Sequence, residues 1–553
     1  MELSNMKKYF LLLVLVFTFF GAAAQPGVKC WVVFKDKNNS PFKISEPSQY
    51  LSQRAILRRQ RQAIAITITD FPVNPAYLTG LQAEGAAIIH TSRWMNAALV
   101  TLPEDKIKKL SKISYIKNIS RLEKDKPSPL ISKFELEERH FQKEENSRAA
   151  ASYNYGPSYN QAHMIGADCM HEKGFKGEGM VIAVLDAGFY NANILPAFDS
   201  LRVNGQILGC RDFVSGDTLV YEDYPHGMNV LSCMGGNLPG RIVGTAPQAD
   251  YWLIRTEESA SETMQEEINW LKGAEFADSV GADIINSSLG YSVFDDASTN
   301  HTYADLEGNS TIVTKAADMA AAAGILVVSS AGNSGGYPWF KITAPADADS
   351  ILTVGAVDAS GTITGFSSRG PTADGRIKPN TVAQGGGSTI AANGGDITFA
   401  NGTSFSSPIT AGAAACLWQA HPDKSNMEII HAIQQSASKA TSPDTVMGYG
   451  IPDFCKAHRL LGGVEDIVYE ESFSVYPNPF KNDFQFAFYS AEKQTVLIEL
   501  FDITGKAIYS ESADFEIYSD NRFHIPANNL AAGVYMIIVK TDKKTYQEKV
   551  LKQ

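Results

Sequence analysis

Between residues 155 and 460 the sequence alternates short apolar runs with helix-like stretches, and this alternation constrains the fold more than any other feature. The run 181–186 is apolar until it ends in Asp186. Runs of this length and character are typical of strands buried on both faces, as in parallel sheets. Strands that alternate with helices predict an α/β fold with three layers, a parallel sheet covered by helices on both faces. Further strand candidates are 250–255, 283–288, 325–330 and 351–357.

Two helices can be bounded from local signals. Ser259 and Glu262 form a possible capping box, which predicts a helix that reaches about Val280. A second helix is predicted at about 312–323, because Gly324 supplies a normal C-terminal stop.

The segment 402–408 reads Gly-Thr-Ser-Phe-Ser-Ser-Pro and leads into small residues at 411–415. A Gly-Thr-Ser turn that opens a helix places Ser404 where backbone N–H groups and the helix dipole favour negative charge. Such a position suits a nucleophilic hydroxyl and the binding of an oxyanion. Pro408 is then expected in the first helical turn, which tolerates proline. Taken alone, the segment also fits an ordinary capped helix.

Two other residues complete a set with known chemistry. Asp186 ends a predicted strand, and open α/β sheets place their sites at the carboxyl ends of strands. His226 begins a small, apolar helical stretch, 226–232. A nucleophilic serine needs a base to accept its proton and a carboxylate to fix the imidazole tautomer. Asp186, His226 and Ser404 supply all three, in that order along the chain.

With these motifs and five more, residues 155–460 resemble the subtilisin family of serine endopeptidases, whose triad runs in the order Asp, His, Ser. The additional motifs are Gly-Thr-Ala-Pro-Gln-Ala at 244–249, Ile-Asn-Ser-Ser-Leu-Gly at 285–290, Ala-Gly-Asn-Ser-Gly at 331–335, Phe-Ser-Ser-Arg-Gly-Pro at 366–371 and Lys-Pro-Asn at 378–380.

The resemblance implies a secreted serine endopeptidase that works through an acyl-enzyme. Ser404 would attack the scissile carbonyl, His226 would transfer the proton, and Asp186 would orient the imidazole. Asn333 would donate its amide to the oxyanion together with the Ser404 backbone N–H. The residues implied in substrate binding are Ser288, Leu289, Gly290, Ala331 and Gly332.

The chain departs from the family pattern in three places. Ala187 replaces the Ser or Thr that usually follows the catalytic Asp, so a hydroxyl beside that carboxylate is missing. Met228 and Asn229 replace the Thr-His of the family's His-Gly-Thr-His. The stretch 235–243 does not keep the family's calcium-loop pattern. We therefore expect no required cofactor and no metal ligands, while calcium binding stays open.

Two alternatives to an endopeptidase remain. A subtilisin-like pseudoenzyme would serve as an adhesin or binding module, but such a module has no reason to keep Asn333 as well as the three triad residues. An esterase or peptide ligase could use the same scaffold, and the comparison of amide with ester turnover would separate these activities.

The N-terminus predicts export. Residues 1–24 contain Lys7 and Lys8, an apolar stretch over 10–20 and three alanines before Gln25, as in a cleaved signal peptide. The apolar stretch is too short for an ordinary membrane span, so we expect a soluble, exported mature protein.

Residues 25–123 resemble the inhibitor-like propeptide of secreted subtilisins, a small α+β domain, with strands at 30–34 and 94–100 and a helix at 103–110. Residues 124–152 are charged and polar, which predicts a linker with a processing site. The peptidase domain is placed at 153–462.

Formal net charge is −12, and no basic tract suggests nucleic acid binding. The densest basic cluster, Arg58, Arg59 and Arg61, is interpreted as a solvated helix face.

After a linker at 463–470, residues 471–553 read as a small β-sandwich with turns at 502–505 and 531–533. Tyr-Pro-Asn-Pro at 476–479 and the run 530–537 resemble the C-terminal sorting domains of the Bacteroidetes type IX secretion system. An accessory domain that binds sugar or protein is the alternative. The expected partners are thus protein or peptide substrates, the chain's own propeptide and the secretion machinery, at the cell surface or in the medium.

Six cysteines are present, and export permits disulfides. Removal of Cys30 with the propeptide leaves five, so at least one thiol must be free. Cys233 and Cys416 fall on apolar helices and are predicted to be buried thiols. No pairing can be assigned from the sequence.

Overall fold

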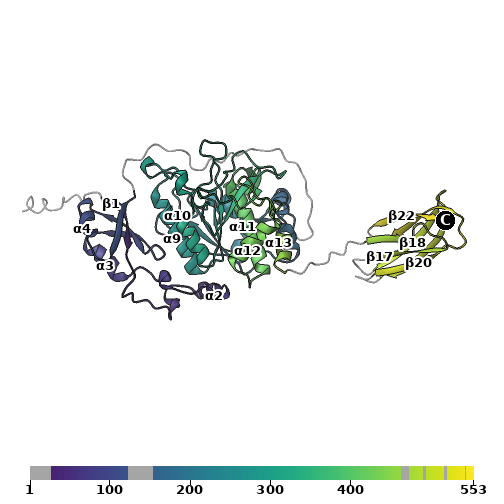
Figure 1. Ribbon diagram of the computed structural model, residues 1–553, viewed down its shortest axis with the longest axis horizontal. Coiled ribbons are helices and arrows are strands. Elements are labelled where there is room, and N and C mark those ends of the chain that lie inside the picture. Colours follow the sequence, from purple (N-terminus) through teal and green to yellow (C-terminus); the bar gives the residue numbers. More distant parts are fainter. Residues whose placement is uncertain (1–26, 123–152, 463–471, 490–493, 516–519, 542–543) are drawn as a thin grey trace, which may run out of the picture. The chain divides into compact units, whose positions relative to one another are not determined.

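The computed structural model describes residues 27–122, 153–462, 472–489, 494–515, 520–541 and 544–553 (Figure 1). The predicted signal peptide 1–24 and the predicted linkers 124–152 and 463–470 lie outside these residues. The chain divides into two compact units, Met1–Gly463 and Val464–Gln553, and each is described here by itself.

A seven-stranded parallel sheet forms the centre of the first unit. Its strand order is β13-β12-β11-β10-β5-β9-β6. The five predicted strands are confirmed to within a residue or two. The strand bounds are β5 (Val181–Asp186), β6 (Ile207–Asp212), β9 (Asp250–Arg255), β10 (Ile284–Ser287), β11 (Leu326–Ser330), β12 (Leu352–Val357) and β13 (Thr381–Gln384).

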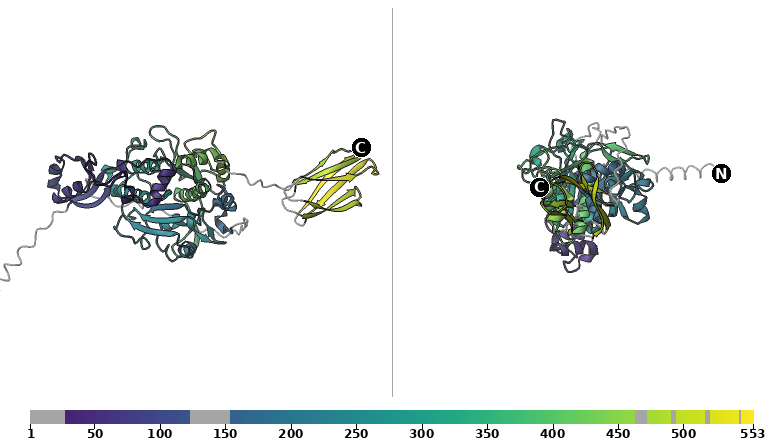
Figure 2. Two further views of the ribbon diagram at one scale, coloured as in Figure 1. Left: turned by 90° about the horizontal axis from the view of Figure 1, so that it is seen from below. Right: turned by 90° about the vertical axis from the view of Figure 1, so that its right-hand side faces the viewer.

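Helices cover both faces of this sheet, which confirms the predicted three layers (Figures 1 and 2). Along β5, Ile182 and Val184 pack into one core, while Val181, Ala183 and Leu185 pack into the other. This alternation explains why the whole strand is apolar, since both of its faces are buried. The first core contains α8 (His226–Gly235), α11 (Thr403–Ala420), α12 (Asn426–Ser436) and α13 (Phe454–Leu460); the second contains α9 (Met264–Val280) and α10 (Ile312–Ala322).

The helix ends show one correction. Helix α9 ends at Val280 as predicted, but Thr263 and Glu266 form its capping box, not Ser259 and Glu262. The Glu262 N–H instead donates to Asp295 Oδ2 at 3.1 Å, which holds this residue in the preceding loop. Helix α10 stops before Gly324, whose φ of +89° suits glycine, as predicted.

Shorter elements complete the region. They are α5 (Tyr159–His163), α6 (Ala167–Glu172), α7 (Asp199–Val203), the strand pair β7 (Asn237–Leu238) and β8 (Ile242–Val243), and the hairpin β14 (Ser388–Ala391) and β15 (Ile397–Ala400).

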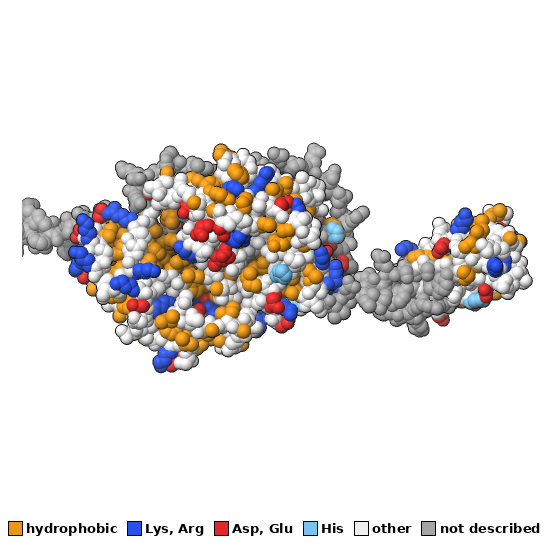
Figure 3. All heavy atoms as spheres, viewed as in Figure 1, with side chains coloured by type: hydrophobic (Ala, Val, Ile, Leu, Met, Phe, Trp, Pro, Cys, Tyr) orange, Lys and Arg blue, Asp and Glu red, His pale blue; other side chains and the backbone are white. Residues whose placement is uncertain are grey.

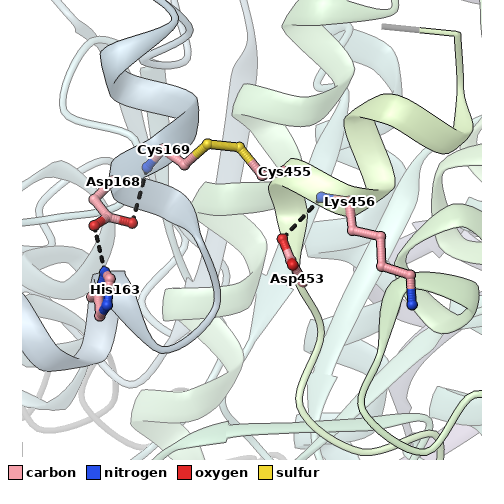
Figure 4. Close-up of a disulfide and its surroundings, with 6 residues drawn as sticks. All are labelled: His163, Asp168, Cys169, Asp453, Cys455 and Lys456. Carbon is pink, nitrogen blue, oxygen red and sulfur yellow. Dashed lines mark hydrogen bonds and ion pairs between the residues drawn. A yellow bond between two sulfur atoms is a disulfide. The ribbon is translucent and has the colours of Figure 1, made fainter. Parts of the chain in front are cut away.

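A disulfide joins Cys169 of α6 to Cys455 of α13, with their Cα atoms 6.1 Å apart (Figure 4). It ties the first helices of the α/β region to its last helix, across 286 residues of sequence. Cys30, Cys210, Cys233 and Cys416 are free thiols. The predictions of at least one free thiol and of buried thiols at 233 and 416 are therefore confirmed.

The N-terminal region, 27–122, is a four-stranded antiparallel sheet of order β2-β3-β1-β4 with short helices. The predicted second strand starts three residues late, at Ala97, because residues 93–96 form a turn in which Asn96 has a φ of +47°. The predicted helix at 103–110 is a 3₁₀ turn followed by α4. The bounds are β1 (Val28–Phe34), α2 (Gln53–Arg61), α3 (Pro75–Ala83), β2 (Ala87–Ser92), β3 (Ala97–Leu102), α4 (Ile107–Leu110) and β4 (Ile116–Arg121).

The interpretation of the arginine cluster on α2 as a solvated face is wrong for two of its three members. Arg58 and Arg59 are 0% and 1% exposed. Both side chains pair with the buried carboxylate of Asp278 on α9. Only Arg61 keeps a partly exposed side chain.

The second unit is a β-sandwich, as predicted, with sheets β16-β17-β20 and β19-β18-β21-β22. Its core includes Phe484, Ile498 and Ile537. The predicted turn at 502–505 joins two strands, and Asp502 Oδ1 accepts the Thr504 N–H there. The bounds are β16 (Ser472–Tyr476), β17 (Asp483–Tyr489), β18 (Gln494–Asp502), β19 (Ala507–Phe515), β20 (Asp520–Pro526), β21 (Gly533–Lys540) and β22 (Thr545–Lys552).

Charged and apolar side chains are intermixed on the face that Figure 3 shows. Within the described part of the chain, no helix is both long enough and apolar enough to cross a bilayer.

The buried His171 makes stability depend on pH. Its Nε2 lies 3.0 Å from Thr245 O, and its Nδ1 faces the Tyr155 hydroxyl, so the ring is neutral with its proton on Nε2. Burial lowers the pKa of His171 to about 4, against the smaller opposing effect of the Thr245 hydrogen bond. Between pH 6.5 and 4 the unfolded chain therefore binds a proton that the folded chain does not, and the free energy of unfolding falls as pH falls.

We expect His171→Phe to weaken this dependence. Each unit of pKa shift corresponds to about 1.4 kcal/mol, so the loss of stability between pH 7 and 4.5 should shrink by about 2–3 kcal/mol in the variant. Urea unfolding of the wild-type and variant chains at the two pH values measures the change in the free energy of unfolding. All other titrating groups are common to both chains, so the difference reports His171. An unchanged pH dependence in the variant would contradict this account.

Candidate active site

Three neighbouring strands bring the predicted site residues to one edge of the sheet. Asp186 is the last residue of β5, Ser288 follows β10, and Ala331 follows β11. These strands are adjacent and parallel, in the order β11-β10-β5. Their carboxyl ends therefore meet where open α/β sheets place ligands.

The carboxylate of Asp186 is buried and holds the ring of His226. Asp186 Oδ1 lies 2.7 Å from His226 Nδ1 and accepts the Ala187 N–H at 2.8 Å. Helix α8 begins at His226 and can approach this strand end because its next residue is glycine: a Cβ on Gly227 would lie 2.5 Å from Gly188 O. A carboxylate on Nδ1 keeps a proton there and leaves Nε2 as the basic nitrogen.

The missing hydroxyl at Ala187 coincides with an unpaired oxygen of Asp186. Asp186 Oδ2 is buried and has no hydrogen-bond partner among the described residues. The second departure places Asn229 on α8, where its Nδ2 donates to Ala391 O at 2.7 Å and fixes the helix to β14.

Ser404 is the second residue of α11 and is 9% exposed. Pro408 lies inside this helix, beyond the first turn where we expected it. Proline has no N–H for the carbonyl four residues earlier, which is that of Ser404. Ser288 Oγ donates to this carbonyl at 2.9 Å, and Ser404 Oγ donates back to Ser288 O at 3.4 Å. The proline thus frees a carbonyl that fastens the serine to the end of β10.

The side-chain amide of Asn333 is held in place by Thr403, the residue before Ser404. Asn333 Oδ1 accepts the Thr403 N–H at 2.9 Å and the Thr403 Oγ1–H at 2.8 Å. A Cβ on Gly402 would lie 3.6 Å from both Asn333 Nδ2 and Ser404 N. The two donors thus lie on the same side of Gly402, and the second residue of a helix has no intrahelical acceptor for its N–H.

The predicted substrate-binding residues form two segments, 288–290 and 331–332, and the side chain of Thr343 lies against both. A Cβ on Gly290 would lie 2.1 Å from Thr343 Oγ1, and one on Gly332 would lie 2.9 Å from the same atom. Ser288, Leu289 and Ala331 are buried beside the strand ends. Thr343 is thus the side chain that the two segments share, and no sequence motif pointed to it.

Arg255 was also missed. It ends β9 next to the end of β5, where its Nε donates to Ala187 O at 3.2 Å. Its Nη1 lies 3.0 Å from Asp212 Oδ2 and 3.2 Å from Asp223 Oδ1. The arginine therefore links the segment after Asp186 to the segment before His226.

Three glutamates gather near the start of α9. Among the described residues, the carboxylates of Glu257, Glu262 and Glu266 offer ligand atoms within 4.8 Å of one another. None of them belongs to the stretch 235–243 that was compared with the family's calcium loop.

Three parts of the chain match known families. Residues 177–450 match the subtilase family, residues 29–134 match the peptidase S8 propeptide domain of Bacteroidota, and residues 474–553 match the secretion system C-terminal sorting domain. The predicted domain boundaries themselves stay predictions.

Individual subtilisins are similar in sequence to this chain. Subtilisin DY of Bacillus licheniformis is 30% identical over 278 residues, 50% of this chain and 89% of the relative. Subtilisin E of Bacillus subtilis is 28% identical over 367 residues, 65% of this chain and 80% of the relative. The subtilase match and the subtilisin relatives show a serine endopeptidase. The chain belongs to the subtilase family, with an S8 propeptide region and a C-terminal sorting domain.

Proposed function

We propose that this protein hydrolyses peptide bonds with Asp186, His226 and Ser404 as a catalytic triad. Ser404 Oγ attacks the scissile carbonyl carbon and passes its proton to His226 Nε2, while Asp186 stabilises the imidazolium through Nδ1. Collapse of the tetrahedral intermediate breaks the C–N bond, and His226 returns the proton to the leaving amine. Water then attacks the acyl-enzyme by the same proton route and releases Ser404.

The observation that carries this proposal is the pair of N–H donors beside Gly402. A Cβ on Gly402 would contact Asn333 Nδ2, Ser404 N and Phe405 Cε2, each at 3.6 Å. Two N–H donors beside a nucleophilic serine stabilise a tetrahedral oxyanion. A binding module would gain nothing from keeping both donors beside this serine, so the pair favours the enzyme over the pseudoenzyme.

Substrate would pair as an added strand with Ser288–Gly290 and place its side chain near Ala331, Gly332 and Thr343. No step of this mechanism requires a cofactor.

The test is hydrolysis of unfolded casein by the purified, processed protein. We expect new N-termini to accumulate catalytically, with amide as well as ester substrates turned over. Ester turnover without amide turnover would favour the esterase, and binding of casein without cleavage would favour the pseudoenzyme.

We further propose that the sandwich directs secretion to the cell surface or the medium, after export by the signal peptide at 1–24. Its match to a sorting domain supports this role. The sandwich belongs to a separate compact unit, and every candidate catalytic residue lies in the other one.

Deletion of residues 471–553 should therefore leave casein hydrolysis within about twofold and stop delivery of the protein beyond the periplasm of a native-type host. Cell fractionation with activity assays measures both. Normal delivery with lost attachment to a surface or polymer would instead favour an accessory binding domain.

A further inference from the structure

Helix α2 of the propeptide docks on the peptidase domain away from the propeptide's own sheet (Figure 1). It contacts the C-terminal ends of α9 and α10. Arg54 Nε donates to Gly281 O at 2.9 Å, Arg58 Nε donates to Ala323 O at 3.3 Å, and Gln62 Nε2 donates to Gly324 O at 2.7 Å. Carbonyls at a helix C-terminus carry partial negative charge, which favours cations at these positions.

Asp278 is the centre of this contact. Arg59 binds it through two hydrogen bonds, Nη1 to Oδ1 at 2.8 Å and Nη2 to Oδ2 at 2.9 Å. Arg58 and Arg93 of the propeptide pair with the same carboxylate, which is fully buried. Burial alone would raise the pKa of Asp278, but the arginines lower it to about 2. The carboxylate therefore stays charged because three propeptide side chains surround it.

Two further carboxylates of the peptidase domain face the propeptide. Asp283 pairs with Arg54 and, at 3.4 Å, with Arg61. Glu275 Oε1 accepts the Ser92 hydroxyl and, at 3.1 Å, the Trp94 N–H. We call Glu275, Asp278, Asp283 and the last carbonyls of α9 and α10 the acidic socket.

The acidic socket lies at the amino ends of the parallel strands, and the candidate active site lies at their carboxyl ends. Asp283 comes directly before β10, and Ser288 comes directly after it. Five residues of extended strand separate their Cα atoms by roughly 16 Å. The contacts of the socket are therefore made at a different place from the candidate active site.

We propose that the acidic socket is a second recognition site of the peptidase domain, specific for an arginine-bearing helix, which holds the propeptide after its chain has been cut. The proposal rests on the inhibitor role that the sequence resemblance implies for the propeptide, and it names where that inhibitor is recognised. Once the propeptide leaves, the acidic socket faces solvent and accepts helices with arginines placed like Arg54, Arg58 and Arg59. Lysine cannot replace Arg59, because an ammonium group does not bind both carboxylate oxygens in the planar fork of a guanidinium.

The test uses the full chain with Ser404→Ala, so that binding is measured without self-digestion. A recognition sequence for an unrelated protease is inserted between residues 124 and 152, and the folded chain is cut there. The dissociation constant of the two pieces is then measured by sedimentation with a fluorescent label on the propeptide. Because no turnover is involved, the result stands whether or not the proposed catalytic mechanism holds.

We expect Arg58→Gln and Arg59→Gln each to raise the dissociation constant at least 100-fold, because each removes one of the three guanidinium groups that neutralise the buried Asp278. Arg59→Gln also removes the ion pair with Asp70 inside the propeptide. Arg121→Gln is the matched control, since Arg121 pairs with Glu104 inside the propeptide; its dissociation constant should stay within threefold of the parent chain. Asp278→Asn should weaken binding like the arginine variants. Combined with Arg59→Gln it should weaken binding by less than the product of the two single effects, because the two side chains form one interaction.

Two measurements keep the test decisive if a glutamine variant destabilises the propeptide. Asp278→Asn changes only the peptidase piece, whose folding is checked by circular dichroism, and Arg59→Lys keeps the charge and should still weaken binding at least tenfold. If Asp278→Asn and Arg59→Lys both bind within threefold of the parent chain, the acidic socket is not a recognition site.

Discussion

Replacement of Ser404 by alanine should abolish casein hydrolysis by the processed protein, lowering kcat by about 10⁶, a magnitude known from subtilisin itself. The side chain supplies the electron pair that forms the acyl-enzyme, and no other group can take over that bond. Turnover is measured with a peptide amide. Since self-processing would also stop, the propeptide of the variant is removed by an unrelated protease cutting between 124 and 152.

Ser406→Ala is the matched control. Ser406 lies on the same helix, is fully buried, and donates only to Thr403 O, so its loss should leave turnover within about tenfold of the wild-type value. Hydrolysis by the Ser404→Ala chain at a rate close to that of Ser406→Ala would exclude Ser404 as the nucleophile.

Asn333→Ala should lower kcat by about 10²–10³, equivalent to about 2.7–4 kcal/mol of transition-state stabilisation, with little change in KM; this magnitude too comes from subtilisin. The amide of Asn333 lies beside Gly402, and the oxyanion forms only after attack. Its contribution therefore belongs to the transition state and not to substrate binding.

Thr403→Val should have a smaller effect in the same direction, because it removes one of the two hydrogen bonds that orient Asn333. Asn160→Ala removes an amide elsewhere in the domain, where Nδ2 bonds Gln384, and should leave kcat unchanged. A drop of less than fivefold for Asn333→Ala would mean that its amide does not face the oxyanion.

The central strands could be predicted because burial on both faces makes the whole run apolar. In β5 each residue enters one of the two cores, so no polar residue interrupts the run before Asp186. The edge strands β6 and β13 were not predicted. Strand β6 is half-exposed and mixes Gly, Cys and Arg with apolar residues, while β13 has only four residues.

Local signals failed where a distant residue decided between alternatives. The sequence predicted a capping box at Ser259 and Glu262, but the box forms four residues later, at Thr263 and Glu266, and the Glu262 N–H donates to Asp295 in the preceding loop. Likewise, Arg58 and Asp278 are 220 residues apart, so the burial of the arginine cluster is invisible in its own segment.

Part of the candidate site could likewise be predicted from the sequence, and part of it could not. Asp186, His226 and Ser404 are marked in the sequence by strand and helix ends, and the fold brings the first two within hydrogen-bond distance. The orientation of Asn333 by Thr403 depends on segments 70 residues apart, and the link made by Arg255 depends on the order of strands in the sheet. Neither could be read before the topology was known.

The most direct measurement of the proposed mechanism is the reaction of the processed protein with a serine-directed phosphonate, followed by intact mass and peptide mapping. Only a hydroxyl activated by a neighbouring base beside an oxyanion site reacts quickly with such a reagent. The account predicts one phosphonyl group per chain, on the peptide that contains Ser404, with loss of turnover in proportion to labelling. A label on another residue, or full labelling with retained hydrolysis, would contradict it.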